Sequence, residues 1–199
     1  MSEISRIDLW QVLDSRGNPT VAARVHIGAH HAIAIAPAGA STGSHEALFL
    51  RDGGSSYDGK SVHQVIERFA RDVSPSLIGL AGNDFHELDK SLRAVDPSAT
   101  QSRYGGHIPV AITIATWLAY AKHSNSQPFE VIAAHLNCAP ALPMPMVNIF
   151  SGGAHAASAI DIQDILAIPT RASSFSEGLE WVWRIREATK KSLASKGFD

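Results

Sequence analysis

Three short apolar runs at the start of the chain most constrain its fold. Residues 4–13 alternate between apolar and polar side chains, and residues 20–27 and 32–36 form the second and third runs. The Gly-Asn-Pro sequence at residues 17–19 indicates a turn between the first two runs. Because strands with such tight connections pair antiparallel, the sequence predicts a three-stranded antiparallel meander.

Apolar residues then recur at helical spacing in four segments. The segments begin near Ser61, Phe85, Ile108 and Phe129. Ser61 is expected to cap the first helix. The third segment, residues 108–122, is apolar nearly all round and is therefore expected to be buried. A meander with helices on one face is an α+β domain.

The composition of the chain changes at Pro140, which divides it into a domain of residues 1–139 and a second unit of residues 140–199. Residues 146–150 and 160–168 are predicted strands, and residues 151–158 are a loop of small residues between them. A final helix is expected to be capped by Ser173 or Ser174 and to end near Lys196. Two strands and one helix are too few elements to close a core.

The charge and cysteine content exclude several classes of function. The net charge is -2 and the pI is about 6.5, so nucleic acid is not expected as a partner. We find no signal peptide and no apolar stretch long enough to cross a membrane. Cys138, the only cysteine, cannot form an internal disulfide, which fits a cytoplasmic location. We expect its side chain to be a buried or half-buried filler.

Three sequence motifs follow one another in an order that resembles the enolase family, the lyases of the 2-phosphoglycerate and phosphoenolpyruvate step. They are LDSRGNPT at residues 13–20, GASTG at 39–43 with LRD at 50–52, and LPMPM at 142–146 with Gly-Gly at 152–153 and Gln163. The resemblance implies an enolase-like N-terminal α+β domain, the meander plus helices. It also implies that residues 140–199 are the first strands and helix of an incomplete (β/α) barrel.

The GASTG motif resembles the family's lid over the substrate. Gly39 and Gly43 let the loop flex and approach a ligand closely. The resemblance implies that Gly39 and Ala40 contact substrate, and that Ser41 ligates a second, catalytic Mg²⁺ through its hydroxyl and carbonyl oxygens. Oxygen ligands suit this ion. Taken without the resemblance, the same residues fit an ordinary polar turn.

The second group of candidate site residues lies beyond Pro140. By resemblance, His155 would reach the substrate phosphate or the leaving hydroxyl, Gln163 would touch the substrate, and Asp164 would serve the acid side of the reaction. The family has glutamate where this chain has Asp164, so the carboxyl group is set back by about one bond length. Taken alone, His155 fits a surface or packing role equally well.

The chain departs from the family pattern at several positions near the expected site. Phe49 replaces an acidic residue, residues 105–108 read Gly-Gly-His-Ile where Gly-Ala-Asn-Ala is usual, and Ser151 stands in place of asparagine. Asp164 begins an Asp-Ile-Leu sequence where Glu-Phe-Met is usual. These changes favour a specialised relative over an ordinary glycolytic enzyme.

Two hypotheses about function remain open. In the first, the chain is the N-terminal subunit of an enolase-like, Mg²⁺-dependent carbon–oxygen lyase that acts on a small phospho- or phosphonocarboxylate. A second polypeptide supplies the remaining barrel, with its lysine base and metal-binding carboxylates, and the chain is inactive alone. Dimerisation through the N-terminal domain is also expected. In the second hypothesis, the chain is a non-catalytic, enolase-derived binding module or an excised fragment.

Overall fold

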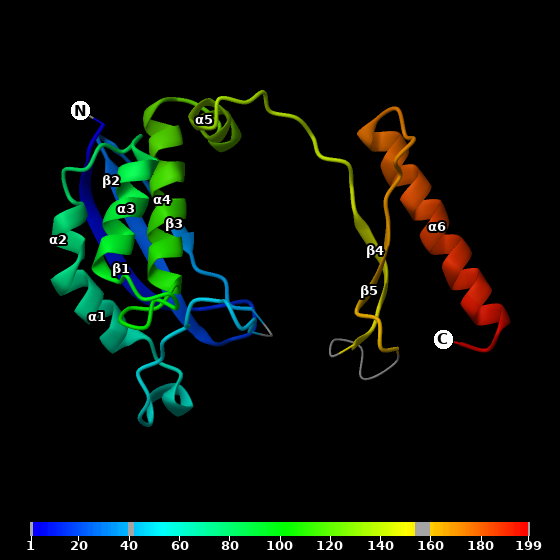
Figure 1. Ribbon diagram of the computed structural model, residues 1–199, viewed down its shortest axis with the longest axis horizontal. Helices are drawn as coiled ribbons and strands as arrows, with labels where there is room; N and C mark the ends of the chain where they lie inside the picture. Colours follow the sequence, from blue (N-terminus) through cyan, green and yellow to red (C-terminus); the bar gives the residue numbers. More distant parts are fainter. Residues whose placement is uncertain (1, 40–41, 154–159, 199) are drawn as a thin grey trace. The chain divides into compact units, whose positions relative to one another are not determined.

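The computed structural model describes residues 2–39, 42–153 and 160–198. The chain forms two compact units, Met1–Ala139 and Pro140–Asp199, which are described separately below (Figure 1).

The first unit is built on a three-stranded antiparallel sheet in the order β1-β2-β3, which confirms the predicted meander. Its strands are β1 (Ile4–Leu13), β2 (Pro19–Ile27) and β3 (His30–Ile35). The Asp14 carboxylate accepts hydrogen bonds from the backbone N–H groups of Arg16 and Asn18, at 2.9 and 2.8 Å. This local bonding closes the turn between β1 and β2.

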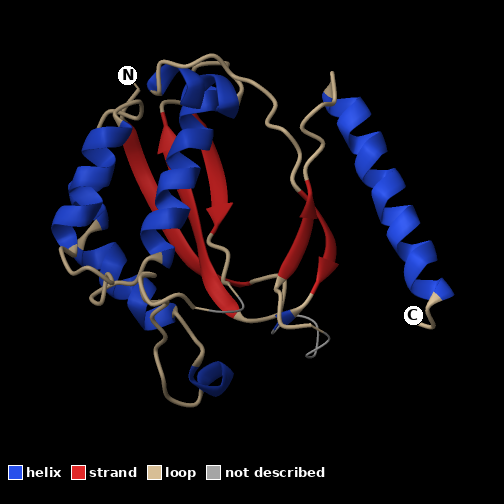
Figure 2. Cartoon of the chain, turned by 45° about the vertical axis from the view of Figure 1, so that its right-hand side comes forward, coloured by secondary structure: helices blue, strands red, loops and turns tan. Residues whose placement is uncertain are grey.

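Five α-helices and a short 3₁₀ turn follow the sheet. They are η1 (Ser56–Gly59), α1 (His63–Asp72), α2 (Ser74–Leu77), α3 (Phe85–Val95), α4 (His107–His123) and α5 (Pro128–His135). Helix α4 packs on β2 and β3, and α1 packs on β1 (Figure 2). The four predicted helices are present. The four-residue helix α2 was not predicted, because it is too short to show a periodic pattern.

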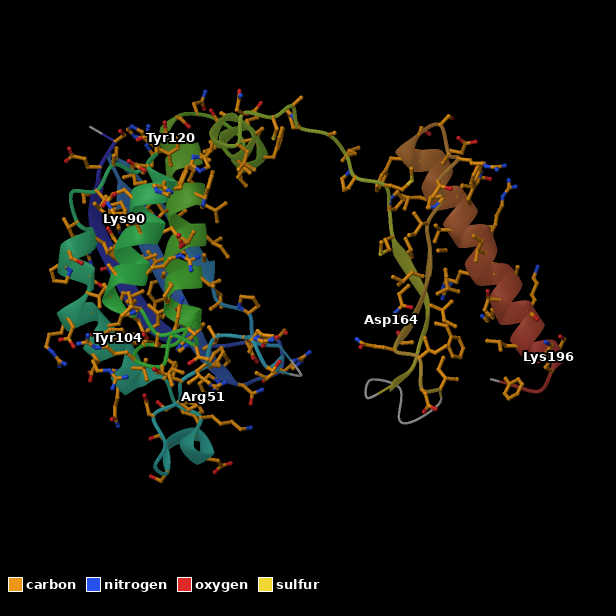
Figure 3. The ribbon with its side chains drawn as sticks, in the orientation of Figure 1. Arg51, Lys90, Tyr104, Tyr120, Asp164 and Lys196 are labelled. Carbon is orange, nitrogen blue, oxygen red and sulfur yellow. The ribbon has the colours of Figure 1, made fainter. Side chains whose placement is uncertain are left out.

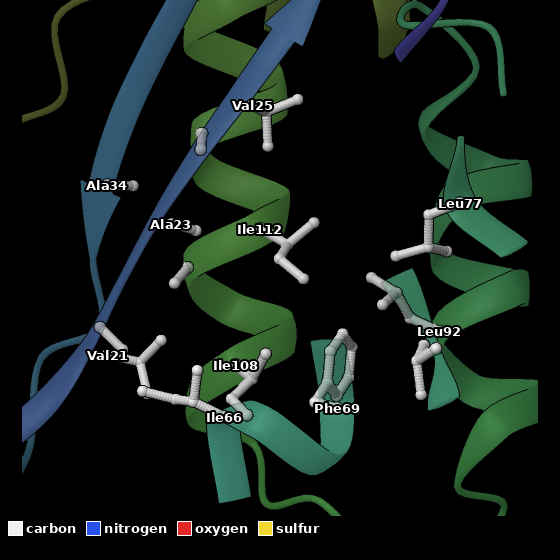
Figure 4. Close-up of a cluster of buried hydrophobic side chains, with 14 of the residues drawn as sticks. Val21, Ala23, Val25, Ala34, Ile66, Phe69, Leu77, Leu92, Ile108 and Ile112 are labelled. Carbon is white, nitrogen blue, oxygen red and sulfur yellow. The ribbon is translucent and has the colours of Figure 1, made fainter. Parts of the chain in front are cut away.

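The core lies between α4 and the sheet. Ile108 and Ile112 of α4 meet Val21, Ala23 and Val25 of β2, and α1 contributes Phe69 (Figure 4). The expectation that α4 is buried on all sides was wrong, because Val110 and Ile114 are more than 40% exposed. The helix buries one face only, and its other face is apolar but open.

The start of α1 agrees with the prediction only in part. The N-cap residue is Val62, but the Ser61 hydroxyl accepts a hydrogen bond from the backbone N–H of His63, the first residue of the helix, at 3.3 Å. Asp52 also accepts hydrogen bonds from the backbone N–H groups of Gln64 and Val65, at 3.0 and 3.1 Å, and Ser61 donates its hydroxyl to the same carboxylate. Partial burial raises the pKa of Asp52, but these hydrogen bonds outweigh it and leave the pKa below its usual value.

The second unit contains β4 (Val147–Ser151), β5 (Asp164–Ala167) and α6 (Phe175–Ser195). The two strands pair antiparallel, and in the described residues they do not close a barrel. Strand β5 is shorter than predicted, because residues 160–163 form bends. Ser174 is the N-cap of α6 and accepts a hydrogen bond from the backbone of Glu177 at 3.2 Å, so the second of the two predicted caps is correct.

Two further features concern the predictions about membrane-spanning segments and about Cys138. Within the described residues, no helix is long and apolar enough to cross a membrane. Cys138 is exposed, so the expectation that it fills a buried or half-buried position was wrong. It follows α5 in a loop that leads out of the first unit, where little surrounds it.

The core of the first unit can be tested with two identical substitutions on one helix. Ile112 is fully buried, whereas Ile114 is 41% exposed. Ile112→Ala is expected to lower the free energy of unfolding by about 2–5 kcal/mol, because it removes buried methyl groups and leaves a cavity. Ile114→Ala is expected to lower it by less than about 1 kcal/mol. Urea unfolding followed by circular dichroism measures both, and equal losses would contradict this packing.

Candidate functional site

Asp164 is the first residue of β5, and its carboxylate is held by two side chains of β4 (Figure 3). The Asn148 side-chain amide donates to Asp164 Oδ1 at 2.6 Å and to Ser151 Oγ at 2.6 Å. The Ser151 hydroxyl donates to the same Oδ1 at 3.3 Å. All three side chains are exposed in this chain. The result is a small polar cluster at the end of the strand pair.

The backbone beside this cluster is closely fitted. Gly152 N–H donates to the carbonyl of Gln163 at 2.7 Å, and Gly153 N–H donates to the carbonyl of Ile160 at 2.7 Å. A Cβ atom at Gly152 would overlap the carbonyl oxygen of Ile162, so only glycine fits there. Gln163 is thereby fixed next to Asp164, with its side chain exposed.

A separate cavity of about 610 Å³ lies in the first unit, at the root of the glycine-flanked loop. Its walls include Gly39, Thr42, Glu46, Arg51 and His107. Two backbone hydrogen bonds tie the loop to the segment before α4: Leu48 N–H donates to Thr100 at 2.7 Å, and Gly106 N–H donates to Leu48 at 3.0 Å. The cavity therefore has one fixed wall, and the loop's first residues form the other.

Three stacked side chains make up the fixed wall. The ring of Phe49 lies parallel to the ring of His107, with centroids 4.3 Å apart, and the Arg51 guanidinium covers Phe49 at 4.2 Å. Arg51 also donates hydrogen bonds to the backbone carbonyls of Pro19 and Lys60, which fix its position. The stack joins the end of the loop to the sheet and to α4.

His107 is buried without a hydrogen-bond partner for either ring nitrogen in the described part of the chain. It is 5% exposed. Burial lowers the pKa of its imidazole to about 4, and the nearby Arg51 charge adds to this effect. The side chain is therefore neutral at physiological pH.

Comparison with known families shows which family the chain belongs to. The model of the enolase N-terminal domain matches residues 4–132, and the model of the enolase C-terminal TIM barrel domain matches residues 139–198. The chain belongs to the enolase family. The resemblance read from the sequence is therefore confirmed: the first unit matches the N-terminal domain, and the second matches part of the barrel domain.

The enolase-like site residues expected from the sequence fall into three groups. Ala40, Ser41 and His155 lie outside the described residues. Gly39 is exposed and lines the cavity of the first unit. Gln163 and Asp164 lie side by side at the start of β5, where Asn148 and Ser151 join them. The roles assigned to these residues remain predictions.

Four residues that the structure adds to the site left little or no signal in the sequence. Phe49, His107 and Ser151 were visible as departures from the enolase pattern, but nothing in the sequence showed that Phe49 and His107 touch. Asn148 was assigned no role from the sequence. Its contact with Asp164 depends on how the two strands pair, which the sequence does not reveal.

The described residues do not by themselves make a magnesium site. They contain no cluster of three or more His, Cys, Asp or Glu side chains that could hold a metal ion. Asp164 offers one carboxylate, and its Oδ1 already accepts two hydrogen bonds. A complete octahedral set of oxygen ligands would need donors beyond these residues.

The burial of His107 predicts a loss of stability in acid. Because its pKa is lower in the folded chain than the unfolded value near 6.5, the unfolded chain binds more protons between these two values. The contribution of His107 is complete above about pH 6.5 and is lost as the pH falls toward about 4, by roughly 3 kcal/mol at most.

Urea unfolding of the first unit at several pH values measures this effect. His107→Asn removes the titrating group, so it is expected to flatten the decline between pH 6.5 and 4, whatever it does to stability at neutral pH. His86→Phe, at an exposed position on α3, is the control and should keep the decline. A decline of the same slope in His107→Asn would show that another group is responsible.

Proposed function

We propose that this chain carries part of the active site of an enolase-like carbon–oxygen lyase. The reaction is the dehydration of a small phospho- or phosphonocarboxylate. The proposal is supported chiefly by Gln163 and Asp164, which resemble the family's Gln-Glu pair, in a chain that belongs to the enolase family. The Asp164 carboxyl group is fixed by two hydrogen-bond donors beside a glycine pair that admits no side chain at Gly152.

In such a dehydration, a base removes the α-proton of the substrate and the bond to the leaving hydroxyl breaks. The leaving oxygen takes up a proton and departs as water. We propose that Asp164 and His155 serve this second half of the reaction, and that Gln163 orients the substrate by hydrogen bonding. Gly39 and Ala40 would contact the substrate through their backbone. The lysine base expected of the family would come from the rest of the barrel.

Magnesium is part of the proposal only as a requirement of the complete site. When bound, it would stabilise negative charge on the substrate carboxylate. Ser41 would provide one oxygen ligand, and the remaining ligands would come from the substrate and from residues outside this sequence. A cytoplasmic setting is also part of the proposal, since the one cysteine of the chain is exposed and free.

We propose that a second polypeptide supplies the rest of the barrel. A complete (β/α)₈ barrel takes about 250 residues, and the described residues of the second unit form two strands and one helix. Large apolar side chains on these elements are exposed: Ile165, Leu166, Phe175, Leu179, Trp183 and Ile185. An apolar surface of this kind needs a covering partner. Further barrel strands and helices would provide one.

Isolation from the native source tests the partnership. A tagged chain is expected to copurify with a stoichiometric second chain that contains enolase-barrel sequence, and an untagged strain is the control. The complex is expected to turn over phospho- or phosphonocarboxylates with Mg²⁺ and to lose activity in EDTA. Recovery of this chain only as a monomer or homodimer, without turnover, would overturn the proposal in favour of a non-catalytic binding module. Recovery as part of a longer single chain would refute the second polypeptide alone.

A charged side chain on the exposed face of α6 should weaken binding of the proposed second polypeptide. Trp183 is 60% exposed, so Trp183→Glu is not expected to unfold the chain, but it would place a carboxylate against an apolar partner. We expect at least a tenfold loss of copurified partner, corresponding to about 1.4 kcal/mol. Ser192→Glu introduces the same charge at another exposed position of α6 and should retain the partner. Equal recovery with both variants would exclude this face as the contact.

Asp164 can be tested once the complex is in hand. Asp164→Asn keeps the size of the side chain but cannot transfer a proton, so kcat is expected to fall by about 100-fold or more. Asp161→Asn, at an exposed position three residues away, is the control. Steady-state kinetics measure both, and an unchanged kcat in Asp164→Asn would remove this residue from the chemistry.

A further inference from the structure

The polar cluster around Asp164 exists because strand β4 carries a bulge. Asn148 lies opposite Leu166 and Phe150 lies opposite Ile165, which leaves Ile149 as an extra residue in β4. In a regular strand, Asn148 and Ser151 would point to opposite faces, since their separation is odd. The extra residue shifts the alternation of side chains by one position, so that Asn148 and Ser151 both point to the face of the sheet that carries Asp164.

Two of the three hydrogen bonds in this cluster converge on one oxygen. Asn148 uses its amide group to reach Asp164 Oδ1 and Ser151 Oγ, both at 2.6 Å. Ser151 then donates to the same Oδ1 at 3.3 Å. These bonds hold Oδ1 in place, and the third bond holds the two donors together.

Two departures from the enolase pattern meet at this point. Ser151 stands where the family has asparagine, and Asp164 stands where it has glutamate. Each residue is shorter than the usual one, and the two are opposite each other in the strand pair. The Ser151 hydroxyl reaches the Asp164 carboxylate at 3.3 Å, so the two shorter side chains are in contact across the strand pair.

We propose that Asn148 and Ser151 are positioning residues that aim the Asp164 carboxyl group, and that Ser151 and Asp164 act as a matched, shortened pair. This inference rests on the proposed function.

A role in stability alone accounts poorly for the cluster. Asn148, Ser151 and Asp164 are all exposed, and hydrogen bonds in exposed positions contribute little to folding because water competes for the same groups. The bulge also removes Ile149 from the regular pairing of a short strand. Such a feature is unfavourable for a sheet and is typical of sites where a side chain must be re-aimed.

Kinetics of the complete enzyme test the positioning. Asn148→Leu and Ser151→Ala are each expected to lower kcat about tenfold, with little change in KM, since the acid is still present but poorly aimed. Ser151→Thr keeps the hydroxyl and should restore kcat. Val147→Ala, in β4 but outside the cluster, is the control for a general disturbance of the sheet and should keep kcat. Equal kinetics in Ser151→Ala and Ser151→Thr, or no loss in Asn148→Leu, would overturn the proposal.

A double-mutant cycle tests the matched pair. Ser151→Asn and Asp164→Glu are each expected to lower kcat by about tenfold, whereas the double variant should recover most of the loss. Additive losses would show that the two positions are independent and would refute the matched pair.

A measurement on the 199-residue chain separates this inference from the proposed function. Three-bond couplings in NMR spectra report whether the Asp164 side chain keeps one χ1 rotamer. A single rotamer is expected in the wild type and in Val147→Ala, and averaging is expected in Asn148→Leu. Averaging in the wild type would refute the positioning even if the complex is active. A single rotamer in the wild type, lost in Asn148→Leu, would support it even if no turnover is found.

Discussion

The packing of α4 on the three-stranded sheet is the contact on which the first unit depends. Ala111, Ala115 and Ala119 are fully buried along this helix. Their small side chains let the helix axis approach the strands closely, while Ile108 and Ile112 fill the space against β2. The same helix begins at His107. The contact that makes the core therefore also sets the position of the stacked wall beside the loop.

The loop that carries the enolase-like GASTG motif is attached to this core at both ends. Ala36 N–H donates to the carbonyl of Val21 at 2.9 Å, which extends the sheet up to the loop's first residues. At the far end, Asp52 bonds to the start of α1, and Arg51 bonds to the end of the β1–β2 turn. Functional loops on rigid scaffolds are commonly held in this way. The polar residues of the second family motif, Arg51 and Asp52, therefore hold the far end of the loop in place.

The sequence predicted the layout of the fold well, because that layout follows from local pattern. The meander, the buried face of α4 and the cap at Ser174 each depend on residues close together in the chain. The cap at Asp52 was missed because it acts across the loop on a helix that begins eleven positions later, at His63. The prediction overestimated how much of α4 is buried. An apolar composition does not show which face of a helix is covered, and Ile114 lies on a face that is exposed in the described chain.

In the candidate site, only residues that belong to sequence motifs could be predicted. Motifs identified Gln163 and Asp164, but they could not show what holds Asp164. That depends on the pairing of β4 with β5, and on one extra residue in β4. The stacking of Phe49 on His107 was hidden for the same reason, since it joins two segments that are far apart in sequence and that each looked like an isolated change.

Because of the bulge at Ile149, the geometry of the site depends on the number of residues in β4. A single-residue deletion in this strand would leave every residue type of the cluster in place, yet it would turn Asn148 to the opposite face of the sheet. Over evolutionary time, we expect relatives that keep this acid to exchange its neighbours for others of matching size, but to conserve the number of residues between Asn148 and the glycine pair. Insertions and deletions would collect elsewhere in the second unit.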